Sequence, residues 1–234
     1  IGIAKTQEEM DAHLAKVDQS SLGTNWGAGD IMYADLDGDG KISNGTNKLG
    51  DTGDYRIIGN STPRFKYGIT LDAAWKGFDF SIFMQGVGKR DLWLDGCYFW
   101  GANGQGNEWQ STGFTEHWDF FRPEGDPLGA NLDAYYPRVN FSGGRNTQVQ
   151  TRYLQNGAYL RLKNVQLGYT LPRVWTEKAG ISSVRVYLSG DNLATITSLS
   201  KIFDPEATGS LAGTGAVKLY PVQRVISVGV NINF

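Results

Sequence analysis

The sequence predicts an all-β protein: about five carboxy-terminal strands of an antiparallel transmembrane β-barrel with long extracellular loops. Three observations lead to this prediction. Apolar residues alternate with polar or small ones in several segments, the longest of them about ten residues, enough for a tilted strand to cross a bilayer. The connections between these segments run short, long, short, long, as in barrels with short periplasmic turns and long outer loops. The chain also finishes on its clearest alternating segment, which ends in Phe234.

Composition is compatible with this fold. The 234 residues include 31 glycines and 12% aromatic residues, which suit twisted strands, long loops and interfacial aromatic girdles. The mean hydropathy of -0.34 is low, and no run of eighteen apolar residues exists, which excludes a transmembrane helix. Only every second residue of a membrane strand faces lipid, so the mean hydropathy of such a strand stays low. The chain starts at Ile1 and its strand number is odd, so we expect a piece of a larger protein whose barrel has earlier strands.

Several function classes are disfavoured. The net charge is -2 without a basic block, so nothing indicates nucleic-acid binding. Cys97 is the only cysteine and cannot form an internal disulfide, which fits an exported protein without disulfides as well as a buried inert thiol. His13 and His117 have no serine or cysteine partner at a recognisable motif spacing, so an enzyme is not expected.

Residues 1–64 are predicted to form an extracellular loop region with one short helix. Thr6 and Glu9 form a capping box, so a helix is expected over roughly 6–18. An acidic loop with the sequence DLDGDGKIS follows at residues 35–43.

This acidic loop resembles a calcium-binding loop in its spacing. Oxygen ligands fall at positions 1, 3, 5, 7 and 9, and Gly40 permits the sharp turn at position 6. Position 12 is Thr46 rather than the bidentate glutamate, so Asp51 or Asp54 would have to fold back to supply the missing carboxylate. The alternative is a solvated acidic turn. We predict a structural calcium ion, with these ligands: Asp35, Asp37, Asp39, the Lys41 carbonyl, Ser43 and Asp54.

Residues 65–234 are predicted to contain the strands. The first two form a hairpin around Lys76-Gly77, and the third is expected to carry a bulge near Asn164, where its alternation changes phase. Trp75, Phe78, Trp175 and Phe234 would gather as an aromatic girdle at the end with the short turns. The expected strands are 65–75, 78–85, 158–171, 184–189 and 224–234, with long loops at about 89–156 and 193–223.

The first long loop is rich in aromatic residues. Flat rings beside Asn, Asp and Gln suit sugars, whose faces are apolar and whose edges are polar. The alternative is that a loop of this length needs its own small core and that the rings supply it. The candidate contacts with cargo or a partner are Trp93, Trp100, Trp109, Trp118 and Tyr136.

Two other function classes remain open from the residues alone. Alternation is also expected in a soluble carbohydrate-binding β-sandwich with a structural calcium ion; the asymmetry of the loops favours the membrane. A cell-surface glycosidase would need a carboxylate pair such as Glu116 and Asp119, whose separation in space the sequence does not give.

Several stretches, in order along nearly the whole chain, resemble the carboxy-terminal part of SusC/RagA-type TonB-linked outer-membrane proteins. The most specific are 159–172 (YLRLKNVQLGYTLP) and the terminal 228–234 (VGVNINF). The others are 35–43 (DLDGDGKIS), 53–54 (GD), 58–64 (IGNSTPR), 136–138 (YPR), 191–193 (DNL) and 204–206 (DPE).

This resemblance implies the last strands of a large plugged barrel of the roughly 22-stranded kind in a bacterial outer membrane. It implies a TonB-dependent importer of nutrient oligomers, glycans or less often peptides. A SusD-like surface lipoprotein would capture cargo with it. TonB would act through an amino-terminal part, with the plug and the remaining barrel, that this sequence does not contain.

Overall fold

The computed structural model describes residues 1–103, 113–141, 144–210 and 222–234. The described residues fall into two compact units. The first combines Ile1–Gly59 with Trp93–Leu154, and the second combines Asn60–Leu92 with Gln155–Ser210 and the carboxy-terminal residues. The first long loop therefore packs with the amino-terminal segment, a grouping that differs from the division at residue 64 expected from sequence.

The first unit contains short elements and includes a small apolar cluster of Ala4, Met10 and Met32. Strands β1 and β2 pair antiparallel. The hydroxyl of Thr6 accepts a hydrogen bond from the Glu9 amide at 3.2 Å, which caps α1 as predicted. The elements are β1 (Gly2–Ile3), α1 (Gln7–Leu14), η1 (Ser20–Leu22), β2 (Ile31–Met32), α2 (Cys97–Trp100) and η3 (Thr115–Trp118).

The long loop of this unit folds around its own aromatic core. Phe99, Trp100 and Tyr153 are almost completely buried, and the rings of Trp100 and Tyr153 meet edge to face with centroids 4.7 Å apart. Tyr136 is also buried and stacks on Tyr153 at 6.3 Å. Such pairs stabilise a core beyond simple area burial. The rings thus serve in the first place as the hydrophobic core of the loop.

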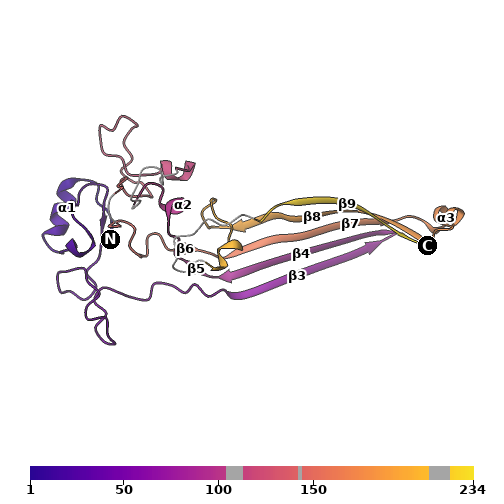
Figure 1. Ribbon diagram of the computed structural model, residues 1–234, viewed down its shortest axis with the longest axis horizontal. Coiled ribbons are helices and arrows are strands. Elements are labelled where there is room, and N and C mark those ends of the chain that lie inside the picture. Colours follow the sequence, from indigo (N-terminus) through magenta and orange to yellow (C-terminus); the bar gives the residue numbers. More distant parts are fainter. Residues whose placement is uncertain (104–112, 142–143, 211–221) are drawn as a thin grey trace. The chain divides into compact units, whose positions relative to one another are not determined.

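The second unit is built on one five-stranded antiparallel sheet of order β3-β4-β7-β8-β9 (Figure 1). Each strand pairs with its sequence neighbour among these five, so the sheet is a meander. The strands are β3 (Arg64–Trp75), β4 (Phe78–Lys89), β7 (Tyr159–Thr170), β8 (Ser183–Thr197) and β9 (Val225–Asn233). Smaller elements are β5 (Asp91–Leu92), which pairs with β6 (Gln155–Asn156), together with α3 (Arg173–Thr176), η4 (Glu177–Ala179) and η5 (Ala207–Ser210).

The turn and the bulge predicted from sequence are both present. Lys76 and Gly77 have φ angles of +48° and +88°, as a two-residue hairpin turn matching the strand twist requires. The pairing registers of β7 shift between Leu162 and Asn164, which confirms the bulge. Strand β8 continues to Thr197, beyond the boundary at 193 expected from alternation, because its second half pairs with the upper half of β7.

One face of the sheet is apolar and exposed. The register brings Ala73, Phe80, Leu167, Leu188 and Val228 into a single row across all five strands. The neighbouring rows are equally apolar, and Leu188 and Val228 are 50% and 75% exposed. Among the described residues the other sheets have two strands each, so none covers this face as a sandwich requires. The β-sandwich alternative is therefore wrong.

The opposite face is polar and internally paired. Arg185 on β8 reaches across β7 to Asp79 on β4, donating from Nε to Oδ1 at 2.9 Å, and also donates to Gln166. Gly168 lies beneath this ion pair, where a Cβ atom would come 2.5 Å from Asp79 Oδ1. Glycine is required here because two long side chains cross over its backbone. A sheet apolar on one face and polar on the other matches the wall of a transmembrane barrel.

The aromatic girdle lies at the end of the sheet with the short connections. Trp75 pairs with Phe78 across the first turn, and the ring of Phe78 lies 4.5 Å from that of Tyr169. Helix α3, which carries Trp175, and the carboxy terminus lie at this same end (Figure 1). None of the helices in the described ranges is both long and apolar enough to cross a bilayer.

Candidate functional site

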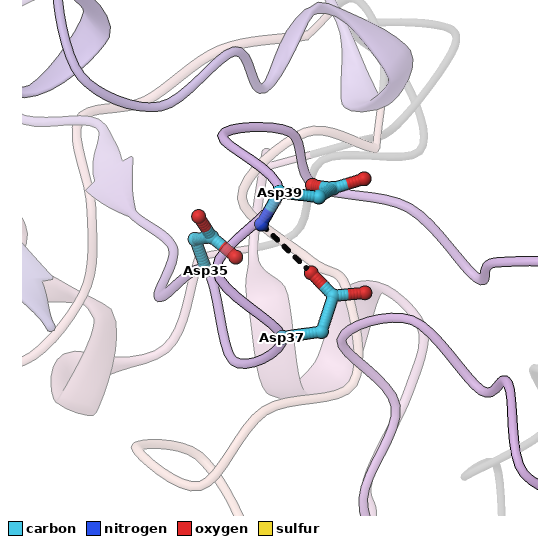
Figure 2. Close-up of side chains that lie close together, drawn as sticks. All are labelled: Asp35, Asp37 and Asp39. Atoms are coloured by element: carbon cyan, nitrogen blue, oxygen red, sulfur yellow. Dashed lines mark hydrogen bonds between the residues drawn. The ribbon is translucent and has the colours of Figure 1, made fainter.

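The acidic loop brings together three of its predicted metal ligands. One carboxylate oxygen from each of Asp35, Asp37 and Asp39 lies within 4.8 Å of the others (Figure 2). Backbone amides fix their positions: Asp35 accepts from Gly40 at 2.9 Å, and Asp37 accepts from the Asp39 amide at 3.2 Å. Oxygen clusters of this kind suit Ca²⁺.

The remaining predicted ligands lie outside this group of three carboxylates. Asp54 folds back to the loop, and its carboxylate accepts from the amides of Leu36 at 2.6 Å and Ser43 at 2.8 Å. The Ser43 hydroxyl accepts from the Gly45 amide, and the backbone of Lys41 bridges to Asp18. Asp54 is thus bonded to the backbone of the acidic loop, whereas Asp51 bonds Thr46 outside this loop.

The carboxylates lie close enough together to affect the pKa of Asp37. The Asp39 amide stabilises the charged form of Asp37, yet burial and the neighbouring carboxylates raise the pKa of Asp37 above its usual value. The pKa of Asp35 is lowered, chiefly by its hydrogen bond from the Gly40 amide. A bound cation would relieve the repulsion around Asp37.

A second candidate site is a pocket of about 220 Å³ in the first long loop (residues 89–156), called the aromatic loop below. Three predicted contact residues, Trp100, Trp118 and Tyr136, line it. Trp93 lies against Trp100, with centroids 5.9 Å apart, but outside the pocket, and Trp109 falls outside the described residues. Among the described residues the lining is Trp100, Gly101, Ala102, Asn103, Gly113, Phe114, His117, Trp118, Phe120, Tyr136 and Val139.

His117 lines this pocket but has both ring nitrogens engaged. Nδ1 accepts from the Phe114 amide at 3.0 Å, so Nε2 carries the proton and donates to the Phe99 carbonyl at 3.0 Å. Burial lowers the pKa of His117, although the bond to Phe99 opposes this effect. A neutral histidine with no free nitrogen holds a turn in place and has none left for proton transfer.

This arrangement predicts a loss of local stability in acid. Because the folded-state pKa of His117 is lowered, neutral His117 contributes fully to the free energy of unfolding above about pH 6.5. This contribution is lost as the pH falls towards the folded-state pKa. We expect the aromatic loop to unfold at lower urea concentration at pH 5 than at pH 7.5, as followed by tryptophan fluorescence. His117→Gln should remove this difference.

His13 provides the control for this pH effect. Its pKa is also lowered by burial, and its Nε2 lies 3.2 Å from the Gln19 side-chain oxygen. If His13→Gln rather than His117→Gln abolishes the pH dependence, the assignment to the pocket is wrong.

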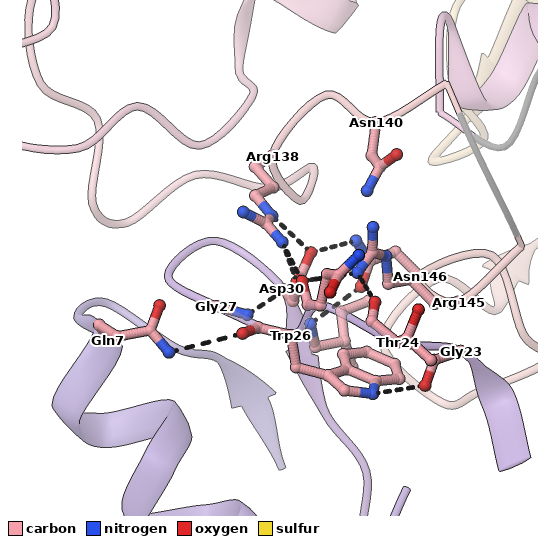
Figure 3. A network of polar contacts seen from close by, with 12 residues as sticks. Gln7, Gly23, Thr24, Trp26, Gly27, Asp30, Arg138, Asn140, Arg145 and Asn146 are labelled. Atoms are coloured by element: carbon pink, nitrogen blue, oxygen red, sulfur yellow. Dashed lines mark hydrogen bonds and ion pairs between the residues drawn. The ribbon is translucent and has the colours of Figure 1, made fainter. Parts of the chain in front are cut away.

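A buried polar network, which the sequence patterns do not predict, joins residues 23–30 to residues 138–146 (Figure 3). Asp30 is completely buried, and Arg138 donates to both of its carboxylate oxygens, at 2.8 and 2.6 Å. Asn146 and the Gly27 amide donate to the same carboxylate. Arg138 belongs to the YPR stretch, so the resemblance pointed to this position without giving its partner.

A second ion-pair cluster holds the DPE stretch against strand β7. Arg161 is buried and donates to Asp204 at 2.7 Å and to Glu206 at 2.6 Å. Lys163 also contacts Glu206, at 3.1 Å. The cluster fixes the start of the second long loop on the sheet.

The chain is similar to known transport proteins. No known protein-family model matches it. It is 33% identical over 215 residues to TonB-dependent receptor P3 of Formosa agariphila, covering 88% of this chain and 19% of that protein. It is 29% identical over 244 residues to TonB-dependent receptor P26 of the same organism, covering 100% of this chain and 22% of that protein. The chain thus spans about a fifth of the length of these relatives.

The chain also superposes on solved structures of a transporter. The RagAB peptide transporter superposes with a TM-score of 0.59 at 26% identity, over 76% of this chain and 18% of that chain. The RagAB peptide importer in the closed-closed state superposes with a TM-score of 0.60 at 25% identity, over 88% of this chain and 21% of that chain. Together with the two-faced sheet, these similarities assign the chain to the SusC/RagA-type TonB-dependent outer-membrane proteins, of whose barrel it forms five antiparallel strands.

Proposed function

We propose that this chain is part of a TonB-dependent importer that carries nutrient oligomers, glycans or peptides, across a bacterial outer membrane. The observation that carries the proposal is the sheet with one continuous apolar face and one polar face. The apolar rows would face lipid, and the face with Asp79 and Arg185 would face the barrel interior. The similarity to the RagAB peptide importer supports the same role.

The first unit is proposed to lie outside the cell. Residues 1–64 and the aromatic loop would meet cargo together with a SusD-like surface lipoprotein. Contact with TonB is assigned to parts of the relatives that this chain does not span. No catalytic step is proposed, since the relatives are named receptors and transporters.

Uptake by cells tests the proposed function. A strain lacking the gene for the full-length protein should fail to accumulate a fluorescently labelled oligopeptide or oligosaccharide that the parent strain imports. Loss of TonB should have the same effect as loss of the gene. Equal uptake in all three strains, for both classes of oligomer, would refute the import role.

We further propose that the acidic loop binds Ca²⁺ and that the ion stiffens this part of the first unit. The carboxylates of Asp35, Asp37 and Asp39 would contribute first, and Lys41, Ser43 and Asp54 would complete the shell after small local movements. The convergence of three carboxylates and the raised pKa of Asp37 support this proposal.

Addition of Ca²⁺ to the chelator-treated full-length protein should slow hydrogen exchange of the amides in residues 36–43. Asp37→Asn removes a carboxylate from the cluster and should weaken Ca²⁺ binding by at least about tenfold. Asp51→Asn is the matched control, because Asp51 bonds Thr46 and lies outside the cluster. Unchanged exchange at millimolar Ca²⁺ would show that the loop is a solvated acidic turn.

A further inference from the structure

We propose that the pocket in the aromatic loop binds one apolar side chain, aromatic or branched, of a peptide cargo. The inference rests on the proposed import function and selects between its two cargo classes. It concerns described residues only, chiefly Phe114, Trp118, Phe120, Tyr136 and Val139.

The size of the pocket limits its ligand. At about 220 Å³ it is smaller than the pockets that enclose whole drug-sized ligands. It therefore has room for one side chain or one sugar ring, which would be one unit of a longer oligomer.

The walls of the pocket are positioned by contacts behind them. The guanidinium of Arg122 lies 5.3 Å from the ring of Trp118 and 4.8 Å from that of Phe120. Arg122 also donates to the carbonyls of Trp118 and Gly129, at 2.8 and 2.7 Å. On the other side, His117 contacts Tyr136 edge to face at 5.3 Å. The pocket is thus formed before a ligand arrives, which lowers the entropic cost of binding.

Two polar side chains of the lining, those of His117 and Asn103, are already engaged. His117 uses both nitrogens on the backbone of the loop. The side-chain oxygen of Asn103 accepts from the Asn140 amide at 3.1 Å. The ring of His117 and the side-chain oxygen of Asn103 are therefore not available to a ligand. The indole nitrogen of Trp100 is buried and has no hydrogen-bond partner among the described residues, so it is the one donor of these three side chains that is not already used.

Several backbone groups around the pocket are engaged as well. The amide of Tyr136 donates to Asp119, and its carbonyl accepts from Phe121. The amides of Gly101 and Asn103 donate within the turn that follows α2. Among the described residues, the pocket then offers a ligand mainly ring faces and the methyl groups of Val139.

This chemistry favours an apolar side chain over a sugar. A pyranose buried here would lose water from several hydroxyls and gain few hydrogen bonds, and each unpaired group costs affinity. An apolar side chain loses nothing on leaving water and gains ring contacts. Of the two oligomer classes, only peptides carry such side chains.

The test compares three probes on the full-length protein purified in detergent, with dissociation constants from calorimetry. The probes are the capped tripeptides acetyl-Ala-Phe-Ala-amide and acetyl-Ala-Ala-Ala-amide, and the sugar laminaritriose. We expect the phenylalanine peptide to bind at least about tenfold more tightly than the alanine peptide. Laminaritriose should not compete with it.

Two variants locate the binding in the pocket. Val139→Trp should fill the mouth and abolish the preference for phenylalanine, whereas Val149→Trp should retain it. Val149 is the matched control because it is similarly exposed, lies in the same unit and does not line the pocket. Trp118→Ala removes an exposed wall ring and should weaken the preference without disturbing the core.

Each contrary result has a distinct meaning. Equal binding of the two peptides, a preference that survives Val139→Trp, or laminaritriose binding lost in Val139→Trp would overturn the inference. If neither peptide binds and Val139→Trp instead weakens binding of a co-purified lipoprotein, the pocket belongs to that partner and the inference is again wrong. TonB-dependent uptake by cells is scored separately, so the import function can stand while the pocket assignment fails.

Discussion

Replacement of Asp30 by alanine is expected to release the contacts between residues 23–30 and 138–146 and to destabilise this region by about 3–5 kcal/mol. Asp30 is completely buried, and its carboxylate accepts from Arg138, Asn146 and the Gly27 amide. Without it, the guanidinium of Arg138 loses its bidentate partner and Asn146 keeps a buried donor without an acceptor. Such groups cost more when left unpaired than they contribute when paired.

Hydrogen exchange on the full-length protein measures this effect. The amides of Gly27, Ile31 and Arg138, which are bonded inside the network, should exchange at least about a hundredfold faster in Asp30→Ala. Asp133→Ala is the matched control, because Asp133 pairs with Lys5 on the surface and its loss should leave the exchange of these amides unchanged. Equal protection in Asp30→Ala and the parent would show that the network contributes little.

Leu188→Arg is expected to destabilise the membrane-inserted barrel by about 2–4 kcal/mol. Leu188 lies on the apolar face of β8, in the row that crosses all five strands, and is half exposed. If this face meets hydrocarbon, the new charge must enter the bilayer. Urea titration of the full-length protein folded into lipid vesicles, read from the mobility of unheated samples on a gel, gives the free energy of unfolding.

Ser189→Arg is the matched control for this substitution. Ser189 is the next residue on the same strand and points to the polar face, beside Gln166 and Ser227. It should be tolerated within about 1 kcal/mol, because an inward charge stays in water. If both variants lose the same stability, the two faces are not in different environments and the lipid-facing assignment is wrong.

The sequence predicts part of each candidate site. Asp35, Asp37 and Asp39 occupy every second position of one short loop. Their carboxylates are therefore brought together by the local backbone of this loop. Trp100, Trp118 and Tyr136 stood out by residue type, but their grouping around one pocket with Phe114 and His117 depends on contacts over long sequence separations. The acidic loop also shows the limit of spacing, since Asp54 reaches the loop through amides of Leu36 and Ser43.

Local patterns in the sequence are enough to predict the five long strands, the hairpin at Lys76-Gly77, the bulge near Asn164 and the two-faced character of the sheet. All of these depend on period-two alternation and on backbone preferences of adjacent residues, which act over a few residues. Three features follow only from the folded chain: the aromatic loop packs with the amino-terminal segment, Asp30 pairs with Arg138, and β8 extends to Thr197. These contacts join residues far apart in the chain, and burial and charge pairing select among partners that local patterns leave equivalent.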